Sequence, residues 1–130
     1  MAEKTARALG KFFEGAAKKY LEARGMQCVD RNYVCRGGEL DLVLRDGAYW
    51  VFAEVKARKS ADYGTPAEFV NATKRRRLWR AAQSYMLENG IGEDAFCRFD
   101  IVEITYRTNA SGVPQDLQIN HIADAFWQER

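Results

Sequence analysis

The stretch GELDLVLRDGAYWVFAEVK, residues 38–56, decides the fold of this chain. Residues 38–44 and 50–56 are rich in branched and aromatic side chains and alternate with period two, which predicts two strands. Asp46-Gly47 lies between them and is a strong signal for a tight hairpin turn. The stretch therefore predicts a pair of antiparallel strands.

This hairpin predicts that several charged side chains share one face of the sheet. With a two-residue loop at Asp46-Gly47, Phe52 pairs with Asp41 and Glu54 pairs with Glu39. Because side chains alternate along a strand, Asp41, Glu39 and Glu54 then share a face with Lys56. The opposite face is apolar and carries Leu40, Leu42 and Leu44 against Val51, Ala53 and Val55.

Three carboxylates on neighbouring strands require an explanation. Like charges directly opposite one another destabilise a sheet. Burying ionised carboxylates is costly unless they are paired or bind a metal. Clustered oxygen ligands suit Mg²⁺ or Mn²⁺. A lysine two residues beyond Glu54 would offset the charge or stabilise negative charge that develops in a reaction.

Length and composition predict one domain, residues 1–130, with a hydrophobic core. The chain is 47% hydrophobic and 29% charged, which is typical of a soluble globular protein. No apolar run approaches the roughly 20 residues that span a bilayer. The first residues lack the apolar stretch of a signal peptide. We therefore expect a cytoplasmic protein that does not enter the membrane.

Few cysteines and histidines are available for chemistry. Cys28, Cys35 and Cys97 are odd in number and lack close metal spacing, so we expect free thiols in a reducing compartment. His121 is the single histidine, which argues against a zinc site and against a Ser-His-Asp hydrolase. No glycine-rich phosphate loop follows a predicted strand, which argues against a nucleotide-dependent enzyme.

The net charge of +2 conceals a basic segment. Residues 56–80 carry a charge of +6, and the rest of the chain carries −4. A basic surface beside a metal site indicates a polyanionic partner, most commonly nucleic acid. A charge run is also typical of a solvated helix face, and the sequence leaves both interpretations open. The basic residues are Lys56, Arg58, Lys59, Lys74, Arg75, Arg76, Arg77 and Arg80.

The rest of the chain predicts an α/β domain with a mixed sheet, in the order helix, three strands, helix, two strands. Residues 5–23 have the apolar spacing of an amphipathic helix, with Glu14 at the edge of the apolar stripe. A second helix is expected from Thr65, with a break near Asn71, to Glu88. Other strands are expected at residues 27–36, 96–106 and 117–122, loops at residues 58–64 and 109–114, and a terminal helical turn at residues 123–127.

Several short motifs occur in a fixed order along the chain. Asp41, followed on the next strand by Glu54-Val55-Lys56, resembles the PD-(D/E)XK nuclease motif. More narrowly, the chain resembles the small bacterial YraN family, which is similar to archaeal Holliday-junction resolvases. Leu40, where proline is common in the superfamily, is a mild departure because the carboxylate binds the metal. The matching motifs are Glu14-x-x-Ala17, Gly38-Glu39-Leu40-Asp41-Leu42, Phe52-Ala53-Glu54-Val55-Lys56-x-Arg58, Gly64-x-Pro66, Lys74 and Arg98-Phe99-Asp100.

This resemblance implies a restriction-endonuclease-like fold, with a mixed central sheet flanked by helices in the order α-β-β-β-α-β-β. It also implies hydrolysis of phosphodiester bonds with Mg²⁺ or Mn²⁺, held by Asp41, Glu54 and the backbone carbonyl of Val55. Glu14 would be an outer ligand or would orient a water. Lys56 would position the attacking water and stabilise the transition state.

The resemblance leaves supporting roles for two further acidic residues. Glu39 would stand behind the metal ligands or pair with a cation such as Arg58. Asp100 would be a structural hydrogen-bond acceptor rather than a ligand.

We interpret the chain as a metal-dependent nuclease acting on DNA, including branched or structured DNA. Two alternatives stay open. One is a nucleic-acid-binding module with the nuclease fold and no turnover. The other is a structural or protein-interaction domain in which the charges form ion pairs. Symmetric cleavage of two strands would favour a two-fold homodimer, but the sequence identifies no interface.

Overall fold

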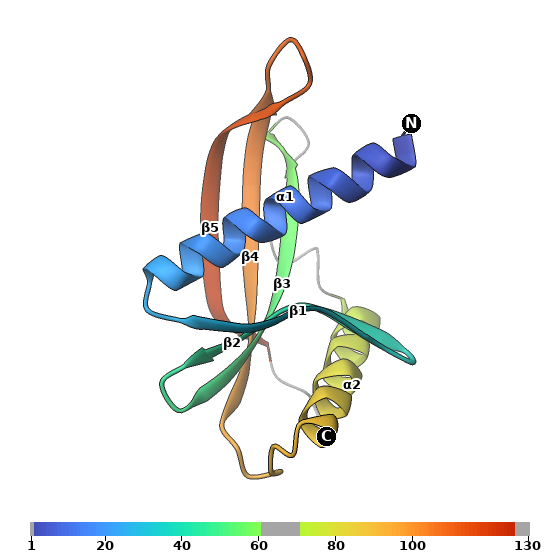
Figure 1. Cartoon of the computed structure of the whole chain (residues 1–130), viewed down its shortest axis with the longest axis vertical. Helices are drawn as coiled ribbons and strands as arrows, with labels where there is room; N and C mark the ends of the chain where they lie inside the picture. Colours follow the sequence, from blue (N-terminus) through green and yellow to red (C-terminus); the bar gives the residue numbers. More distant parts are fainter. Residues whose placement is uncertain (1, 61–70, 127–130) are drawn as a thin grey trace.

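The computed structural model describes residues 2–60 and 71–126, with side chains from residue 6 onward. In this part of the chain a five-stranded mixed sheet carries two helices (Figure 1). Neighbouring strands follow chain order; β3 and β4 are parallel, and the other pairs are antiparallel. The predicted fold class is confirmed. The elements are α1 (Ala2–Ala23), β1 (Gln27–Cys35), β2 (Gly38–Asp46), β3 (Tyr49–Lys59), α2 (Ala72–Glu88), β4 (Cys97–Thr108) and β5 (Pro114–Phe126).

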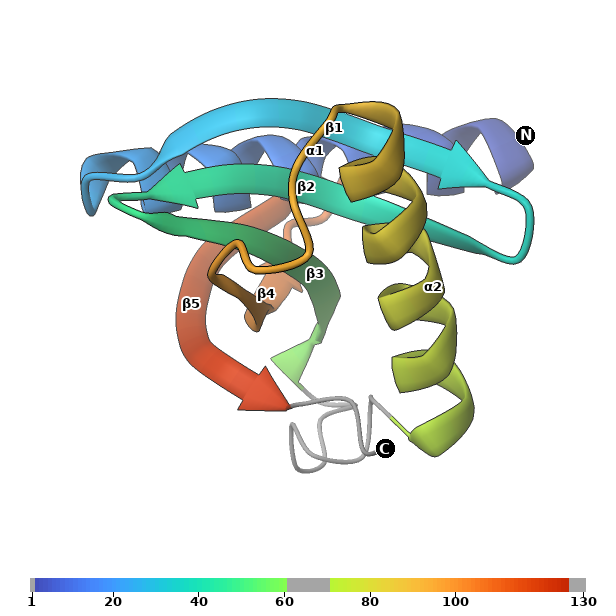
Figure 2. The same cartoon turned by 90° about the horizontal axis from the view of Figure 1, so that it is seen from below.

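The two helices pack on opposite faces of the sheet (Figure 2). Alternation along the strands directs Leu42 and Ala53 toward α1, where they meet Phe13 in one buried cluster. The intervening residues Val43 and Phe52 face the other side and pack with Leu78 of α2. Each helix therefore buries its apolar stripe against one face, as the alternating sequence predicts.

Strand β2 separates from β3 halfway along its length. The ladder between them runs from Asp46 paired with Tyr49 to Leu42 paired with Ala53. Beyond Leu42, residues 38–41 of β2 continue the ladder with β1 but no longer pair with β3. The twisted β1–β2 ribbon thus diverges from β3 and contacts α2 (Figure 2). This separation opens the sheet next to Asp41.

The predicted register of the hairpin is wrong by two residues. The two-residue turn is Gly47–Ala48 rather than Asp46-Gly47. Gly47 has φ +58, so the glycine occupies the first turn position, as in type II′ turns. Phe52 consequently pairs with Val43, not with Asp41. The predicted pair of Glu54 and Glu39 is also absent, because β2 has already left β3 at that point.

Leu40 also departs from the predicted pattern. It packs with Val43 and Phe52 in the cluster under α2 rather than with Leu42 on the other face. This change of face coincides with the end of the β2–β3 ladder. Close packing of β2 on α2 requires Gly38, because a Cβ there would collide with the backbone carbonyl of Arg77.

Several predicted boundaries change. The first helix starts at Ala2, β3 continues to Lys59, and α2 begins at Ala72 after an N-cap at Asn71. The terminal helical turn is wrong within the described residues, because β5 extends to Phe126 and stacks this ring on Phe99. Thr65, Gly64-x-Pro66 and residue 127 lie outside the described residues. No helix in the described ranges is long and apolar enough to cross a bilayer.

Candidate active site

A cleft of 440 Å³ lies where β2 leaves β3, next to the N-terminal half of α1. Its charged lining comes from four elements. α1 contributes one acidic residue, β2 two, β3 an acidic residue and a lysine, and α2 a second lysine. The sequence prediction that Asp41, Glu54 and Lys56 lie together holds, despite the incorrect register. The charged lining residues are Glu14, Glu39, Asp41, Glu54, Lys56 and Lys74.

Asp41 occupies the point of strand separation. Its Oδ2 atom accepts a hydrogen bond from the Val55 backbone N–H at 2.9 Å. The carboxylate thus satisfies a donor of β3 that has lost its β2 neighbour. Burial raises the pKa of Asp41 to about 7, and the adjacent Glu54 carboxylate adds to the shift.

Glu54 is buried, with 7% of its surface exposed, and two lysines balance its charge. Lys74 Nζ lies 2.8 Å from Glu54 Oε1, and Lys56 Nζ lies 3.9 Å from the same atom. Burial lowers the pKa of Lys56, and the nearby Lys74 ammonium lowers it further. Burial alone would also lower the pKa of Lys74, but its bond to Glu54 raises it above the ordinary value.

Glu14 enters the cleft from the edge of the buried stripe of α1, as its spacing predicts. Its Oε1 atom is buried and has no hydrogen-bond partner among the described residues. Burial raises the pKa of Glu14, whereas a hydrogen bond from the Asn32 side chain lowers it. Glu14 Oε1 is therefore available to bind a ligand in the cleft.

Sequence reasoning missed Asn32. Its φ of +53 is left-handed, a conformation that asparagine tolerates better than most residues. Arg31 pairs with Leu42 and Tyr33 with Leu40, so Asn32 lies opposite Asp41 in the β1–β2 ribbon. An unusual backbone conformation next to two acidic side chains marks a candidate functional position. An asparagine within a predicted strand was the one available sequence signal.

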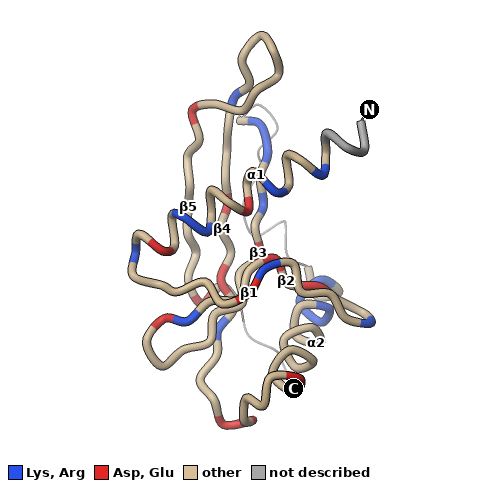
Figure 3. The backbone as a smooth tube through the Cα atoms, viewed as in Figure 1, with Lys and Arg blue, Asp and Glu red and all other residues tan. Residues whose placement is uncertain are grey.

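The basic residues of the predicted segment divide into groups (Figure 3). Lys56 and Lys74 line the cleft, while Arg77 lines an adjoining cleft of 290 Å³ that also includes Glu39, Glu54 and Lys74. Arg75, Arg76 and Arg80 lie on the same N-terminal half of α2. On β3, Arg58 lies 4.0 Å from Glu103, and Lys59 is exposed. The cationic surface therefore continues from the cleft along α2.

Asp100 lies apart from this cleft. It is fully buried and accepts hydrogen bonds from Arg98 Nε at 3.0 Å, from His121 Nε2 at 2.7 Å and from the Asp124 N–H at 2.9 Å. Burial alone would raise the pKa of Asp100, but these hydrogen bonds lower it below the ordinary value. The contacts join β4 to β5, which fits the structural role that the sequence predicts for Asp100.

The donor set of the cleft suits a hard divalent ion. Asp41, Glu54 and Glu14 provide carboxylate oxygens, and one of them, Glu14 Oε1, is buried and unbonded within the described chain. No three His, Cys, Asp or Glu side chains in residues 6–60 and 71–126 are grouped closely enough to hold an ion by themselves. A ligand set of two carboxylates and the Val55 carbonyl stays a prediction, since the observed contact of Val55 is made by its N–H.

These observations define a mixed α/β domain with carboxylates and lysines gathered where two strands separate. Residues 13–104 match the profile described as "Uncharacterised protein family UPF0102". The chain belongs to this family, which is the YraN-like family that its motifs resemble.

Bacterial relatives extend over most of the chain. A UPF0102 protein of Chlorobium chlorochromatii is 38% identical over 122 residues, covering 94% of this chain and 93% of its own length. One from Geobacter sulfurreducens is 41% identical over 118 residues, covering 91% and 88%. One from Symbiobacterium thermophilum is 46% identical over 98 residues, covering 75% and 82%.

The raised pKa of Asp41 predicts a pH-dependent effect of Asp41→Asn. The folded protein keeps this proton up to about pH 7, whereas the unfolded chain loses it near the ordinary pKa of 3.8. The group therefore destabilises the fold progressively as pH rises through that window. Asn removes this cost. In metal-free buffer, the Tm of the variant minus the Tm of wild type should therefore be larger at pH 8 than at pH 5. Each 1 kcal/mol should move the Tm by about 2–8 °C.

Thermal melts at both pH values test this prediction. Glu93→Gln, which neutralises an exposed carboxylate, is the control and should show no such pH dependence. An equal effect of Asp41→Asn at pH 5 and pH 8 would contradict the assigned shift.

Asn32 predicts a contrast between two substitutions. Glycine accepts φ +53, whereas alanine places a Cβ in the left-handed region, so Asn32→Ala should be less stable than Asn32→Gly by about 1 kcal/mol. Both variants lose the hydrogen bond to Glu14 and should bind Mn²⁺ more weakly to a similar extent. Chemical denaturation and Mn²⁺ calorimetry measure the two effects. If Asn32→Gly bound Mn²⁺ like wild type, Asn32 would only shape the ribbon.

Proposed function

We propose that this protein hydrolyses phosphodiester bonds in DNA with Mg²⁺ or Mn²⁺ as cofactor. The observation that carries the proposal is the convergence of Asp41, Glu54 and Lys56 on one cleft. Three elements of chemistry that phosphodiester hydrolysis needs are thereby brought within one site. These are oxygen ligands for a divalent ion, a cation near the reacting phosphate, and space for a substrate.

Asp41 and Glu54 would hold the divalent ion, with the Val55 carbonyl as a third ligand and Glu14 as an outer one. When bound, such an ion lowers the pKa of a coordinated water and polarises the scissile phosphate. A bound cation would offset both causes of the raised pKa of Asp41, which are burial first and the adjacent Glu54 carboxylate second. The cost of these carboxylates in the metal-free protein is a reason to assign the cleft to a cation.

Lys56 would act on the reacting atoms. It follows Glu54 by two residues on β3, so both side chains face the same cleft. Its lowered pKa reflects burial and the adjacent Lys74. In this setting the ammonium would donate to the attacking water and to the phosphate oxygen on which negative charge grows. Fixed donors of this kind act more strongly in a site of low dielectric than in water.

The cationic face of α2 would bind the nucleic-acid backbone. Arg77 lines the adjoining cleft of 290 Å³, and Arg75 and Arg76 precede it on the same helix. Guanidinium groups match the geometry of phosphates. This contact would depend on charge rather than on sequence, so it supports a nucleic acid as the class of partner and no particular base sequence.

A nucleic-acid-binding module without turnover is the second candidate. The observation in its favour is that Lys74 is bonded to Glu54 at 2.8 Å, at the position of a predicted metal ligand. If this ion pair persisted with DNA bound, the charges of the cleft would be balanced without any metal. Metal-dependent cleavage separates the two candidates directly.

Lys56→Ala tests catalysis against binding. Because the proposed role of Lys56 is specific to the transition state, single-turnover cleavage should fall by a factor on the order of 10² to 10³. DNA affinity should change little, since one lysine is a small part of the cationic surface. Cleavage is measured with Mg²⁺ or Mn²⁺ on single-stranded, duplex, flap and four-way-junction DNA, alongside a binding titration.

The outcomes of this experiment differ for each candidate. Equal cleavage rates for wild type and Lys56→Ala would remove Lys56 from the mechanism. Binding without cleavage of any DNA by the wild type would favour the module without turnover. A protein that binds neither DNA nor metal would favour the structural alternative, in which the charges only form ion pairs.

The salt dependence of DNA binding tests the cationic face. Replacing Arg75, Arg76 and Arg77 with alanine should lower DNA affinity and reduce the slope of log K against log salt by about 0.9 for each phosphate that is no longer neutralised. The matched control replaces Lys11, Lys18 and Lys19 of α1, which removes the same charge from the other helix. An unchanged affinity and slope for the arginine variant would mean that these residues form only a solvent-exposed face of α2 and do not contact DNA.

A further inference from the structure

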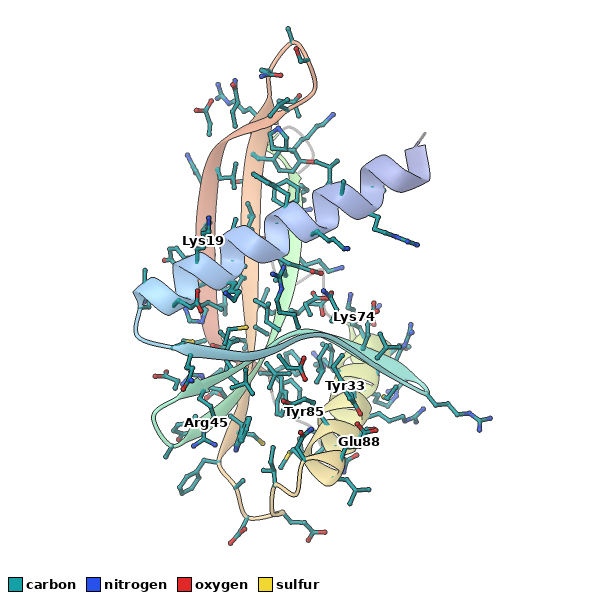
Figure 4. All side chains as sticks on the ribbon, in the orientation of Figure 1. Lys19, Tyr33, Arg45, Lys74, Tyr85 and Glu88 are labelled. Atoms are coloured by element: carbon teal, nitrogen blue, oxygen red, sulfur yellow. The ribbon has the colours of Figure 1, made fainter. Side chains whose placement is uncertain are left out.

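Lys74 has a position that differs from that of every other cation in the basic segment. It belongs to the first turn of α2, where its backbone N–H donates a hydrogen bond of 2.9 Å to Asn71 Oδ1. Figure 4 shows it at the N-terminal end of α2, with Tyr85 and Glu88 nearer the other end. Its side chain lines both the carboxylate cleft and the adjoining cleft that includes Arg77. Lys74 therefore lies between the predicted metal ligands and the predicted phosphate contacts.

An oxygen of Glu54, a predicted metal ligand, already has an ammonium partner in this site. Lys74 Nζ is bonded to Glu54 Oε1 at 2.8 Å, which is the distance of a strong charge-assisted hydrogen bond. A divalent ion on Glu54 would face an ammonium at this oxygen, and the two cations would repel one another. Lys56 contacts this atom more loosely, at 3.9 Å. Metal binding to Glu54 is therefore opposed mainly by Lys74.

Lysine is suited to exchange between partners. Its ammonium is a compact charge on a flexible four-carbon stem, and it binds phosphates as readily as carboxylates. About one third of the Lys74 side chain is exposed, and Lys74 shares the adjoining cleft with Arg77. A phosphate in the adjoining cleft would offer Lys74 an alternative anion within the same region.

We propose that Lys74 is a latch that couples the binding of a divalent ion to the binding of nucleic acid. In the free protein it bonds to Glu54 and weakens metal binding. When a backbone phosphate occupies the adjoining cleft, Lys74 transfers to it, and Glu54 becomes available to the ion. The inference rests on the proposed metal site and nucleic-acid partner, but not on turnover.

Thermodynamic linkage makes this exchange measurable. If DNA raises the affinity for the ion by some factor, the ion must raise the affinity for DNA by the same factor. Couplings between two sites are typically 5–150-fold, so we expect an increase of about tenfold here. The metal-free protein would bind DNA without committing the carboxylates, and the ion would be taken up once the phosphate is in place.

Calorimetry with Ca²⁺ tests the latch. Ca²⁺ takes the same oxygen ligands as Mg²⁺, and affinities are measured with and without a short DNA duplex, with both strands analysed afterwards for cleavage. Lys74→Gln should bind Ca²⁺ more tightly than wild type in the absence of DNA, because Glu54 no longer has its ammonium partner. In wild type, DNA should raise the affinity for Ca²⁺ about tenfold. In Lys74→Gln this increase should be smaller, because only the general attraction of the DNA charge for the ion is left.

Three controls separate the latch from a simple loss of charge. Lys56→Gln removes a charge beside the same oxygen, and Lys19→Gln removes one from the exposed face of α1 (Figure 4). Lys19→Gln should keep the wild-type gain within about twofold, the error of additivity between independent sites. Lys56→Gln should lose less of the gain than Lys74→Gln, because Lys56 contacts Glu54 Oε1 only at the longer distance. Lys74→Arg keeps a cation that binds phosphate and should restore part of the gain. Thermal melts confirm that each variant is folded.

Each result supports or overturns the proposal. A gain in Lys74→Gln equal to that of wild type overturns the latch, as does an equal loss of the gain in Lys56→Gln. Absence of Ca²⁺ binding to the wild type, both with and without DNA, overturns the latch and the metal site together. Coupling through Lys74 in a protein that cleaves no DNA supports the latch while the proposed hydrolysis fails. Cleavage of DNA by the wild type, together with unaltered coupling in Lys74→Gln, supports the proposed hydrolysis and overturns the latch.

Discussion

The hydrogen bond from the Val55 N–H to Asp41 Oδ2 marks the point where the sheet opens, and the candidate site depends on that opening. Up to Leu42 the β2–β3 pair is an ordinary antiparallel ladder, closed by the turn at Gly47. Beyond it β2 follows β1 toward α2, and the Asp41 carboxylate, instead of a β2 backbone carbonyl, accepts the hydrogen bond of the β3 backbone N–H at Val55. Because the strands part here, carboxylates from two strands and from α1 face one cleft instead of solvent.

This arrangement has an electrostatic cost that the fold tolerates only locally. Four acidic side chains line a cleft with two lysines, and burial raises the pKa of Asp41 to about 7. The buried carboxylate of Asp100 is a contrast, because it accepts hydrogen bonds from the Arg98 and His121 side chains and from the Asp124 backbone N–H. A folded protein usually keeps an unbalanced set of charges only where function requires it. The contrast between these two acidic clusters supports the cleft as the functional site.

Much of this could be predicted from the sequence, for identifiable reasons. Period-two alternation and turn chemistry depend on local residues, so the strand pair and its charged face followed from residues 38–56 alone. The register could not be predicted in this way, because Gly47 fits either position of the two-residue turn. The two registers differ by two residues, so both place Asp41 and Glu54 on the same face. The position of Asn32 opposite Asp41 and the contact of Lys74 with Glu54 could not be predicted, because they depend on the twist of the β1–β2 ribbon and on the docking of α2. The strand at residues 123–126 likewise forms through pairing with β4, which overrides local preference.

The central claim is that the cleft between α1, β2 and β3 binds a divalent cation through Asp41 and Glu54. The most direct measurement is an experimental structure of crystals grown with Mn²⁺, in which the anomalous scattering of the metal locates it independently of the protein atoms. The account predicts one anomalous peak in contact with carboxylate oxygens of both residues, and its loss in crystals of Glu54→Gln. Ordered density for the cleft without a peak, with Lys74 still bonded to Glu54 at saturating Mn²⁺, would contradict it.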